Sequence, residues 1–216
     1  MDEERYTLAR RRMVERQIEA RGVTDPRILK AMMEIPRHLF VPEIYRSAAY
    51  DDGPLPIGHG QTISQPYIVA LMTDMLEISP GDRILEIGGG SGYQAAILGR
   101  LATEVITIER LPDIAALARR NLTVVGAANV TVVEANGTLG YTERAPYDGI
   151  IVTAAAPEVP EPLVEQLAEG GRLIAPVGSR GMQMLVKIVK KEGGVVRTSH
   201  GGVMFVPLIG AYGWDE

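Results

Sequence analysis

The chain has 216 residues, 46% of them hydrophobic and 23% charged, which suits one globular domain with a sizeable core. Its formal net charge of −5, with acids and bases interspersed, argues against nucleic acid as the main partner, and no apolar run approaches the ~18 residues of a membrane span. Cysteine is absent, which excludes disulfides and thiol catalysis.

The N-terminal part is predicted to be mainly helical. The elements expected there are helices over 5–21 and 24–35 and a loop over 50–60. Thr24 or Asp25 would cap the second helix, with Pro26 in its first turn. Proline-rich residues end that helix. We expect the first 65 residues to pack on the rest of the chain as an appendage, not as an independent domain.

From residue 66 the pattern alternates between helices and short apolar strands. The predicted helices are 66–77, 91–101, 112–125 and 161–168, and the predicted strands are 83–88, 104–109, 129–135, 147–154 and 171–178. This alternation predicts a doubly wound, mainly parallel, Rossmann-like α/β sheet. The β-rich end, 183–210, predicts closing antiparallel strands, and 203–210 is expected to contain an edge strand that an extended peptide could join. The whole of 1–216 would form a single domain, with 66–216 as its core.

A glycine-rich loop follows the first of these strands. The motif "LEIGGGSGY" places Gly88, Gly90 and Gly92 between a strand and a helix, where glycine allows a sharp turn and helix N–H groups face a ligand. Glu109 ends the next strand, where doubly wound folds keep an acid that binds ribose hydroxyls. A tight turn without a ligand is the alternative, but the acid at this distance favours a nucleoside.

The form of the loop narrows the choice of nucleoside. The dinucleotide pattern GxGxxG fails at Tyr93, and neither GK[ST] nor a GxSxG nucleophile motif is present. Counting Glu86 and Ser91, the loop has the form E-x-G-x-G-S-G, which suits S-adenosylmethionine (AdoMet), a nucleoside without a pyrophosphate. Asn136 and Gly137, at the end of the third strand, are expected to contact its ribose and adenine.

At this point the chain resembles a known family, protein-L-isoaspartate O-methyltransferase. The resemblance runs from "MVERQI" to "FVPLIG"; "ILEIGGGSGYQAAIL" is shared with many AdoMet enzymes, whereas "GHGQTISQPYIVALMTDML" is much more specific. It implies transfer of a methyl group from AdoMet, leaving S-adenosylhomocysteine, to the free carboxylate of L-isoaspartyl residues in damaged proteins and peptides. The ester would then collapse to a succinimide that partly reopens as aspartate.

The resemblance also implies roles for individual residues, with Ser64 at the family's active-site position. The expected cofactor contacts are Gln61, Thr62, Ile63, Glu86, Gly88, Gly90, Ser91, Gly92, Glu109, Asn136 and Gly137. The expected substrate contacts are His59, Thr62, Ile63, Ser64 and Val206. The chain departs from the family at Asn136, where an aspartate is usual, and at Gly89, where threonine is commoner. Because the Asn136 carbonyl can accept a hydrogen bond from the adenine amine, we expect weakened rather than lost binding.

The segment 58–67 has almost no titratable side chains, and this suits the implied reaction. A carboxyl is ionised at neutral pH and needs no general base to act as a nucleophile. What remains is to orient the carboxylate and remove its water, for which hydroxyl and backbone N–H groups suffice. On residue type alone, Ser64 or Gln65 could instead be a helix cap. His59 is expected to be structural or a backbone contact rather than a base.

Other functions stay open at this level. One is an AdoMet enzyme acting on a small molecule or RNA, and another is a non-catalytic module that binds AdoMet and isoaspartyl or C-terminal carboxylates. A dehydrogenase is disfavoured by Tyr93. The three histidines lack ligand spacing, so no metal is expected. With no apolar leader at the N-terminus, we expect a cytoplasmic protein. We also expect a monomer that binds neither nucleic acid nor membrane. The sequence does not determine its substrate preference.

Overall fold

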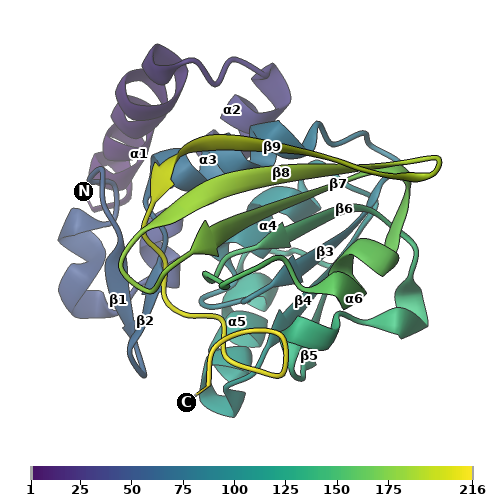
Figure 1. Cartoon of the computed structure of the whole chain (residues 1–216). Coiled ribbons are helices and arrows are strands. Elements are labelled where there is room, and N and C mark those ends of the chain that lie inside the picture. Colours follow the sequence, from purple (N-terminus) through teal and green to yellow (C-terminus); the bar gives the residue numbers. More distant parts are fainter. Residues whose placement is uncertain (1, 216) are drawn as a thin grey trace.

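The computed structural model describes residues 2–215 and has an α/β architecture built on one large sheet (Figure 1). Its seven strands run in the order β5-β4-β3-β6-β7-β8-β9. Strands β3 to β7 pair in parallel, whereas β8 is antiparallel to both β7 and β9. The predicted fold, a mainly parallel sheet that closes with antiparallel strands, is therefore confirmed.

The elements lie close to their predicted positions. The strands of the sheet are β3 (Arg83–Ile87), β4 (Glu104–Glu109), β5 (Val130–Glu134), β6 (Tyr147–Val152), β7 (Leu167–Gly178), β8 (Gln183–Lys191) and β9 (Gly194–Val203). The helices are α1 (Asp2–Met13), α2 (Pro26–Glu34), α3 (Pro66–Leu76), α4 (Tyr93–Gly99), α5 (Pro112–Val124) and α6 (Glu161–Glu165). Helix α6 is shorter than expected because β7 begins at Leu167. Within residues 2–215, none of the helices combines the length and apolarity needed to cross a membrane.

The central strands are apolar on both sides because both faces of the sheet are covered. Successive residues alternate between two buried clusters. Ile84 and Ile151 belong to the cluster that includes residues of helices α2 to α5, whereas Leu85 and Ile150 belong to the cluster that includes residues of α6 and the C-terminal segment. Most helices therefore lie on one face, and α6 with the chain end covers the other (Figure 1).

The N-terminal helices share the core of the sheet. Met13 and Met32, both fully buried, belong to the same cluster as Ile84 of β3. Helix α1 continues as a π-helical stretch and a 3₁₀ turn over residues 14–21, so the expected long helix is present but irregular. Asp25 caps α2 by accepting a hydrogen bond of 2.8 Å from the Arg27 N–H.

Two predictions were wrong. Part of the loop expected over 50–60 forms, together with residues 61–63, a small hairpin of β1 (Leu55–Gly58) and β2 (Gln61–Ile63), which buries Ile57 and Ile63. Segment 203–210 is not an edge strand, since the edge is β9, which ends at Val203. Pro207 has no N–H for a ladder, and the segment instead crosses the end of β6, where the Ala155 N–H donates to the Val206 carbonyl at 2.8 Å.

Candidate functional site

The site lies at the carboxyl ends of β3 and β6. Chain connections run from β3 towards β5 on one side and from β6 towards β9 on the other, so this edge is the switch point where open α/β sheets bind ligands. Three pockets adjoin there. The first and second share Gln61, Gly88, Glu109 and Ala154, and the first and third share Thr62, Ser64, Thr153 and Val206.

The glycine loop forms the floor of the first two pockets. Gly88 has a φ of +96°, and a Cβ there would come within 2.5 Å of the Thr153 Oγ1, so only glycine suits this turn. Gly90 and Ser91 also line the first pocket. Gly92, with a φ of +86°, lines none of the three pockets: a Cβ there would meet Leu122 of α5 at 3.2 Å. It makes room for the packing of α4 on α5.

Glu109 ends β4, is only 8% exposed and lines both the first and the second pocket. One carboxylate oxygen accepts a hydrogen bond of 2.9 Å from the Gly90 N–H, and the other accepts one of 3.0 Å from the Leu111 N–H. The carboxylate therefore fixes the glycine loop while it faces the cleft. Its remaining lone pairs can accept hydrogen bonds from two vicinal hydroxyls.

Glu86 is fully buried at the wall of the first pocket. Within residues 2–215, neither of its carboxyl oxygens has a hydrogen-bond partner. Burial raises the pKa of Glu86 to about 8; the nearby Thr107 hydroxyl opposes this rise, although it is outside hydrogen-bond geometry, and the charge of Glu109 adds to it. An unpartnered buried carboxyl group is costly, and a cationic ligand group would satisfy it. The ammonium of AdoMet is such a group, so the chain's residues fit this cofactor.

The β1–β2 hairpin supplies the opposite wall. Gln61, Thr62 and Ile63 line the first pocket, and Ser64 lies where the first pocket meets the third. Helix α3 begins after Gln65, which makes no side-chain capping bond and instead donates to the Asp52 carboxylate at 2.7 Å. In the part of the chain that the structure describes, the Ser64 hydroxyl has no hydrogen-bond partner. It is therefore not a helix cap and is available to a ligand.

The third pocket is uncharged, because no acidic or basic side chain lines it. Its lining residues are Pro54, Thr62, Ser64, Gln65, Ile68, Thr153, Gly202, Val203, Met204, Phe205 and Val206. They come from the β1–β2 hairpin region, the end of β6 and the segment after β9. An extended peptide could occupy this pocket with one carboxylate at Ser64, next to a ligand in the first pocket.

Besides Gly92, two of the expected site residues lie apart from the pockets. His59 sits at the tip of the hairpin with half of its side chain exposed, and its Nε2 lies 3.5 Å from a carboxylate oxygen of Asp113 on α5. Asn136 turns its carbonyl oxygen into its own turn, where it accepts from the Thr138 N–H at 3.1 Å and from the Thr138 hydroxyl at 2.8 Å. Its neighbour Gly137 does line the second pocket.

Several lining residues were not anticipated from the sequence. Thr153 and Ala154 follow β6, and their place at the carboxyl end of a parallel strand was the signal that could have identified them. Pro207, Leu208 and Ile209 close the second pocket, and no local pattern marks them. Among residues 2–215, no group of three or more His, Asp or Glu side chains is arranged to hold a metal ion.

The chain matches a family of known proteins. Residues 8–213 match the model of the protein-L-isoaspartate(D-aspartate) O-methyltransferase (PCMT) family. The chain is 62% identical over 208 residues to a protein-L-isoaspartate O-methyltransferase of Methanoregula boonei, covering 96% of this chain and 95% of the relative. It is 55% identical over 210 residues to one of Geobacter metallireducens, covering 97% of each.

Solved structures point the same way. A protein-L-isoaspartate O-methyltransferase superposes with a TM-score of 0.86 at 34% identity, covering 94% of this chain and 66% of that one. A putative protein-L-isoaspartate O-methyltransferase from Plasmodium falciparum, in complex with S-adenosyl-L-homocysteine, gives a TM-score of 0.81 at 29% identity, covering 92% of this chain and 97% of that one.

Proposed function

The chain belongs to the protein-L-isoaspartate(D-aspartate) O-methyltransferase family, and we propose that the three adjoining pockets at the carboxyl ends of β3 and β6 are its active site. It is an AdoMet-dependent methyltransferase that esterifies L-isoaspartyl residues of damaged proteins and peptides. The observation that carries the proposed site is the position of Ser64, whose unpartnered hydroxyl lies where two pockets meet.

The first two pockets would hold AdoMet. When bound, AdoMet supplies a methyl group on a sulfonium, which is a good leaving group. Glu109 would accept hydrogen bonds from the ribose hydroxyls, and the buried Glu86 carboxylate would face the cationic ammonium. Gln61, Thr62 and Ile63 of the hairpin would cover the cofactor. These assignments rest on the pockets that the residues line and on the charges that they offer.

The third pocket would hold the isoaspartyl segment. Its free carboxylate is already ionised at neutral pH, so the chain has to orient it and exclude water rather than remove a proton. Ser64 would donate one hydrogen bond to the carboxylate, with Thr62 and Val206 beside it. An arginine or lysine in this pocket would hold the carboxylate more strongly but would draw electron density from the attacking oxygen. The uncharged lining agrees with this gentler mode of binding.

A pair of peptides provides the test, identical except that one contains L-isoaspartate where the other contains aspartate. With methyl-labelled AdoMet, we expect ester formation and later methanol release only from the isoaspartyl peptide. Equal labelling of both peptides would assign the chain a different substrate. Binding of AdoMet and of the isoaspartyl peptide without turnover would favour the non-catalytic module, which the family relationship does not favour.

We also infer that residues 1–216 act as one domain and as a monomer. In support, one buried cluster joins Met13 and Met32 of the N-terminal helices to Ile84 of the sheet. Light scattering of the purified protein tests the second point: a monomer would have a mass close to 23.4 kDa, and twice that value would indicate a dimer.

A further inference from the structure

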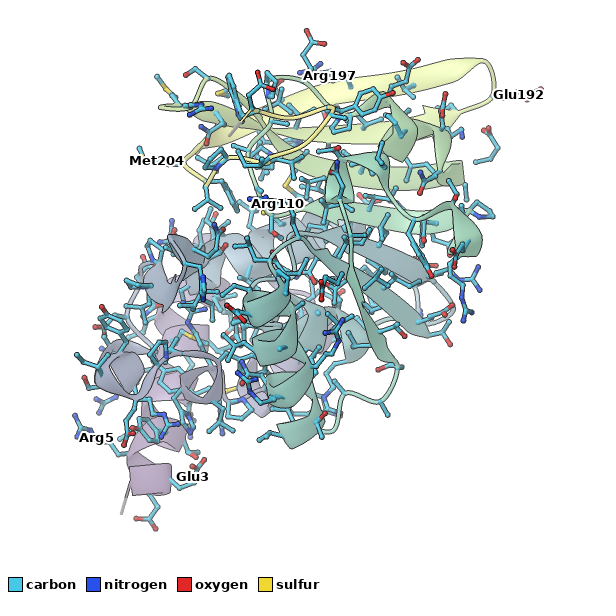
Figure 2. All side chains as sticks on the ribbon, turned by 90° about the horizontal axis from the view of Figure 1, so that it is seen from below. Glu3, Arg5, Arg110, Glu192, Arg197 and Met204 are labelled. Atoms are coloured by element: carbon cyan, nitrogen blue, oxygen red, sulfur yellow. The ribbon has the colours of Figure 1, made fainter. Side chains whose placement is uncertain are left out.

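Three methionines at one end of the β8–β9 hairpin are exposed to solvent. The exposed fraction is 68% for Met182, 43% for Met184 and 78% for Met204. Met204 lines the third pocket, and Figure 2 shows it at the opposite end of the hairpin from Glu192. Described methionines of the N-terminal half differ: Met13, Met32, Met72 and Met75 are buried in the core, and Met33 is partly buried against it. Methionine exposure is therefore concentrated beside one pocket.

The strand register explains why these side chains face outward together. Met184 lies opposite Gly202, and Gln183, which separates Met182 from Met184, is only 1% exposed. Because side chains alternate along a strand, Met182 and Met184 point to the side away from buried Gln183. The Gln183 side-chain carbonyl accepts a hydrogen bond of 2.9 Å from the Phe205 N–H, which holds the segment after β9 beside the start of β8. Val203 is the register partner of Gln183, so Met204 follows the end of β9 on the side opposite Met182 in the ladder.

The methionine cluster (Met182, Met184 and Met204) lies beside the third pocket, to which Met204 itself belongs. Single exposed apolar residues are normal on a protein surface, but contiguous ones mark binding surfaces. Of the ten large hydrophobic residues exposed among those that the structure describes, these three methionines lie at one end of the β8–β9 hairpin, and Val195 and Val196 lie at the other end. The adjoining third pocket offers no charged side chain. A partner for this surface would therefore be apolar.

Methionine is suited to partners of varied shape, because its side chain is unbranched, flexible and polarisable. Surfaces rich in methionine can repack around different apolar groups. A repair enzyme meets isoaspartyl residues in many sequences, so its peptide surface has to accept side chains of different shapes. In folded proteins large apolar side chains are mostly buried. A locally unfolded segment presents more of them together with the isoaspartyl carboxylate.

We propose that the methionine cluster is a docking surface for apolar side chains that flank the isoaspartyl residue in unfolded segments of the substrate. The inference rests on the proposed function, because it takes the third pocket as the place of the isoaspartyl residue. The occupant is the substrate chain itself, since Met204 belongs to both the cluster and the pocket. The cluster selects substrates by apolar flanks and does not discriminate by charge.

Two isoaspartyl peptides test the proposal, one with leucine on both sides of the isoaspartyl residue and one with serine there. We expect the wild-type kcat/KM to be about 5- to 10-fold higher for the leucine peptide, the value of partly burying one or two apolar side chains. In the triple variant M182S/M184S/M204S, kcat/KM for the leucine peptide should fall to the value for the serine peptide. The readout is the ratio of kcat/KM between the two peptides, which should fall close to one; loss of Met204 lowers both values together, because Met204 also lines the third pocket.

Matched variants separate docking from loss of exposed apolar surface in general. Ile44→Ser and Val124→Ser remove side chains that are 79% and 69% exposed and line none of the three pockets, so the leucine preference should persist. Replacing the three methionines by leucine should also preserve it. Thermal melting confirms that each variant is folded.

Peptide binding, measured by fluorescence anisotropy of labelled peptides, keeps this inference separate from the catalytic assignment. If neither peptide is methylated but the leucine peptide still binds more tightly in a methionine-dependent way, the proposed function fails and the docking surface stands. If wild type binds and methylates both peptides equally, or if the preference survives in the triple serine variant, the docking surface is overturned.

Discussion

Two acidic residues under the cleft, Glu86 and Glu109, have opposite surroundings although they come from neighbouring strands. Glu109 accepts hydrogen bonds from two backbone N–H groups, whereas Glu86 has no hydrogen-bond partner among residues 2–215. A buried carboxyl group without a hydrogen-bond partner favours its neutral form. The two residues should therefore respond differently to substitution and to AdoMet.

Substitution of Glu109 should weaken AdoMet binding. Glu109→Ala removes a charged acceptor for the ribose hydroxyls, worth ~1.5–3 kcal/mol, so the dissociation constant should rise roughly 10-fold or more. Glu134→Ala is a matched control, because Glu134 is the exposed register partner of Glu109 at the end of β5. Calorimetric titration with AdoMet measures both. An unchanged affinity in a folded Glu109→Ala protein would remove this residue from the cofactor site.

Substitution of Ser64 should affect catalysis more than stability. Ser64→Ala is expected to lower kcat/KM for an isoaspartyl peptide roughly 10- to 100-fold, the value of one hydrogen bond to a carboxylate, while AdoMet affinity changes less. Because the hydroxyl has no partner among the described residues, the melting temperature should stay nearly constant. Exposed Ser47 provides the control Ser47→Ala. Normal activity with a lowered melting temperature would instead make Ser64 structural.

The buried Glu86 predicts a pH-dependent stability of the cofactor-free protein. Its pKa is raised from 4.5 to about 8, so between these values the folded state keeps a proton that the unfolded state has lost. Its stabilising contribution is full below about pH 4.5 and is lost as pH rises through about 8. Between pH 6 and roughly 8.5, the melting temperature should therefore fall more steeply with pH for wild type than for Glu86→Gln. Equal slopes would mean that Glu86 does not titrate in this range.

At the level of elements, the small β1–β2 hairpin forms one wall of the cleft. A two-stranded ribbon of this kind is only marginally stable by itself. It is fixed by the buried side chains of Ile57 and Ile63, while the contact between His59 and Asp113 at its tip is exposed to solvent. Exposed ion pairs contribute little to stability. The hairpin should therefore keep its position when the contact at its tip is removed.

This arrangement makes a prediction about His59. Since His59 lines none of the three pockets, His59→Gln should change kcat/KM by less than about 3-fold, the scale of an exposed contact. With saturating AdoMet, kcat/KM for the isoaspartyl peptide should stay flat from neutral to mildly alkaline pH in both proteins, because the substrate carboxyl is already ionised. An inflection between about pH 6 and 7, where imidazoles titrate, that vanishes in the variant would identify His59 as a proton-transfer group.

At the level of the whole molecule, the proposed cofactor cleft joins segments that are far apart in the chain. Gln61 of the hairpin, Gly88 of the loop, Glu109 of β4 and Leu208 of the C-terminal segment all line the second pocket. A ligand that contacts all four holds the N-terminal part, the sheet and the chain end together. Binding should therefore stabilise the folded protein as a unit.

The measurable result is a shift in melting temperature. At an AdoMet concentration of about 100 times its dissociation constant, binding adds ~2.7 kcal/mol to the unfolding free energy, which for a chain of this size raises the melting temperature by roughly 5–10 °C. S-Adenosylhomocysteine should act similarly, and Glu109→Ala should show a smaller shift at the same ligand concentration. Absence of a shift for wild type would contradict AdoMet binding in this cleft.

The sequence by itself determined what depends on local periodicity and on short motifs. Alternating apolar runs located the strands, and the capping pattern at Asp25 and Pro26 located the start of α2, because such signals act between residues a few positions apart. The glycine loop and Glu109 were found in the same way, since both lie at ends of predicted strands. The family resemblance predicts an active-site role for Ser64, but nothing local in the sequence distinguishes it from a helix cap.

Only the tertiary structure decided which distant residues meet. Ser64 and Val206 share two pockets although they are separated by most of the chain, and the buried Gln183 holds the pocket wall through Phe205. Burial also determined the raised pKa of Glu86, which a strand pattern cannot reveal. These features follow from packing between segments far apart in sequence. A sequence pattern does not show how deeply such packing buries a side chain or which residues surround it.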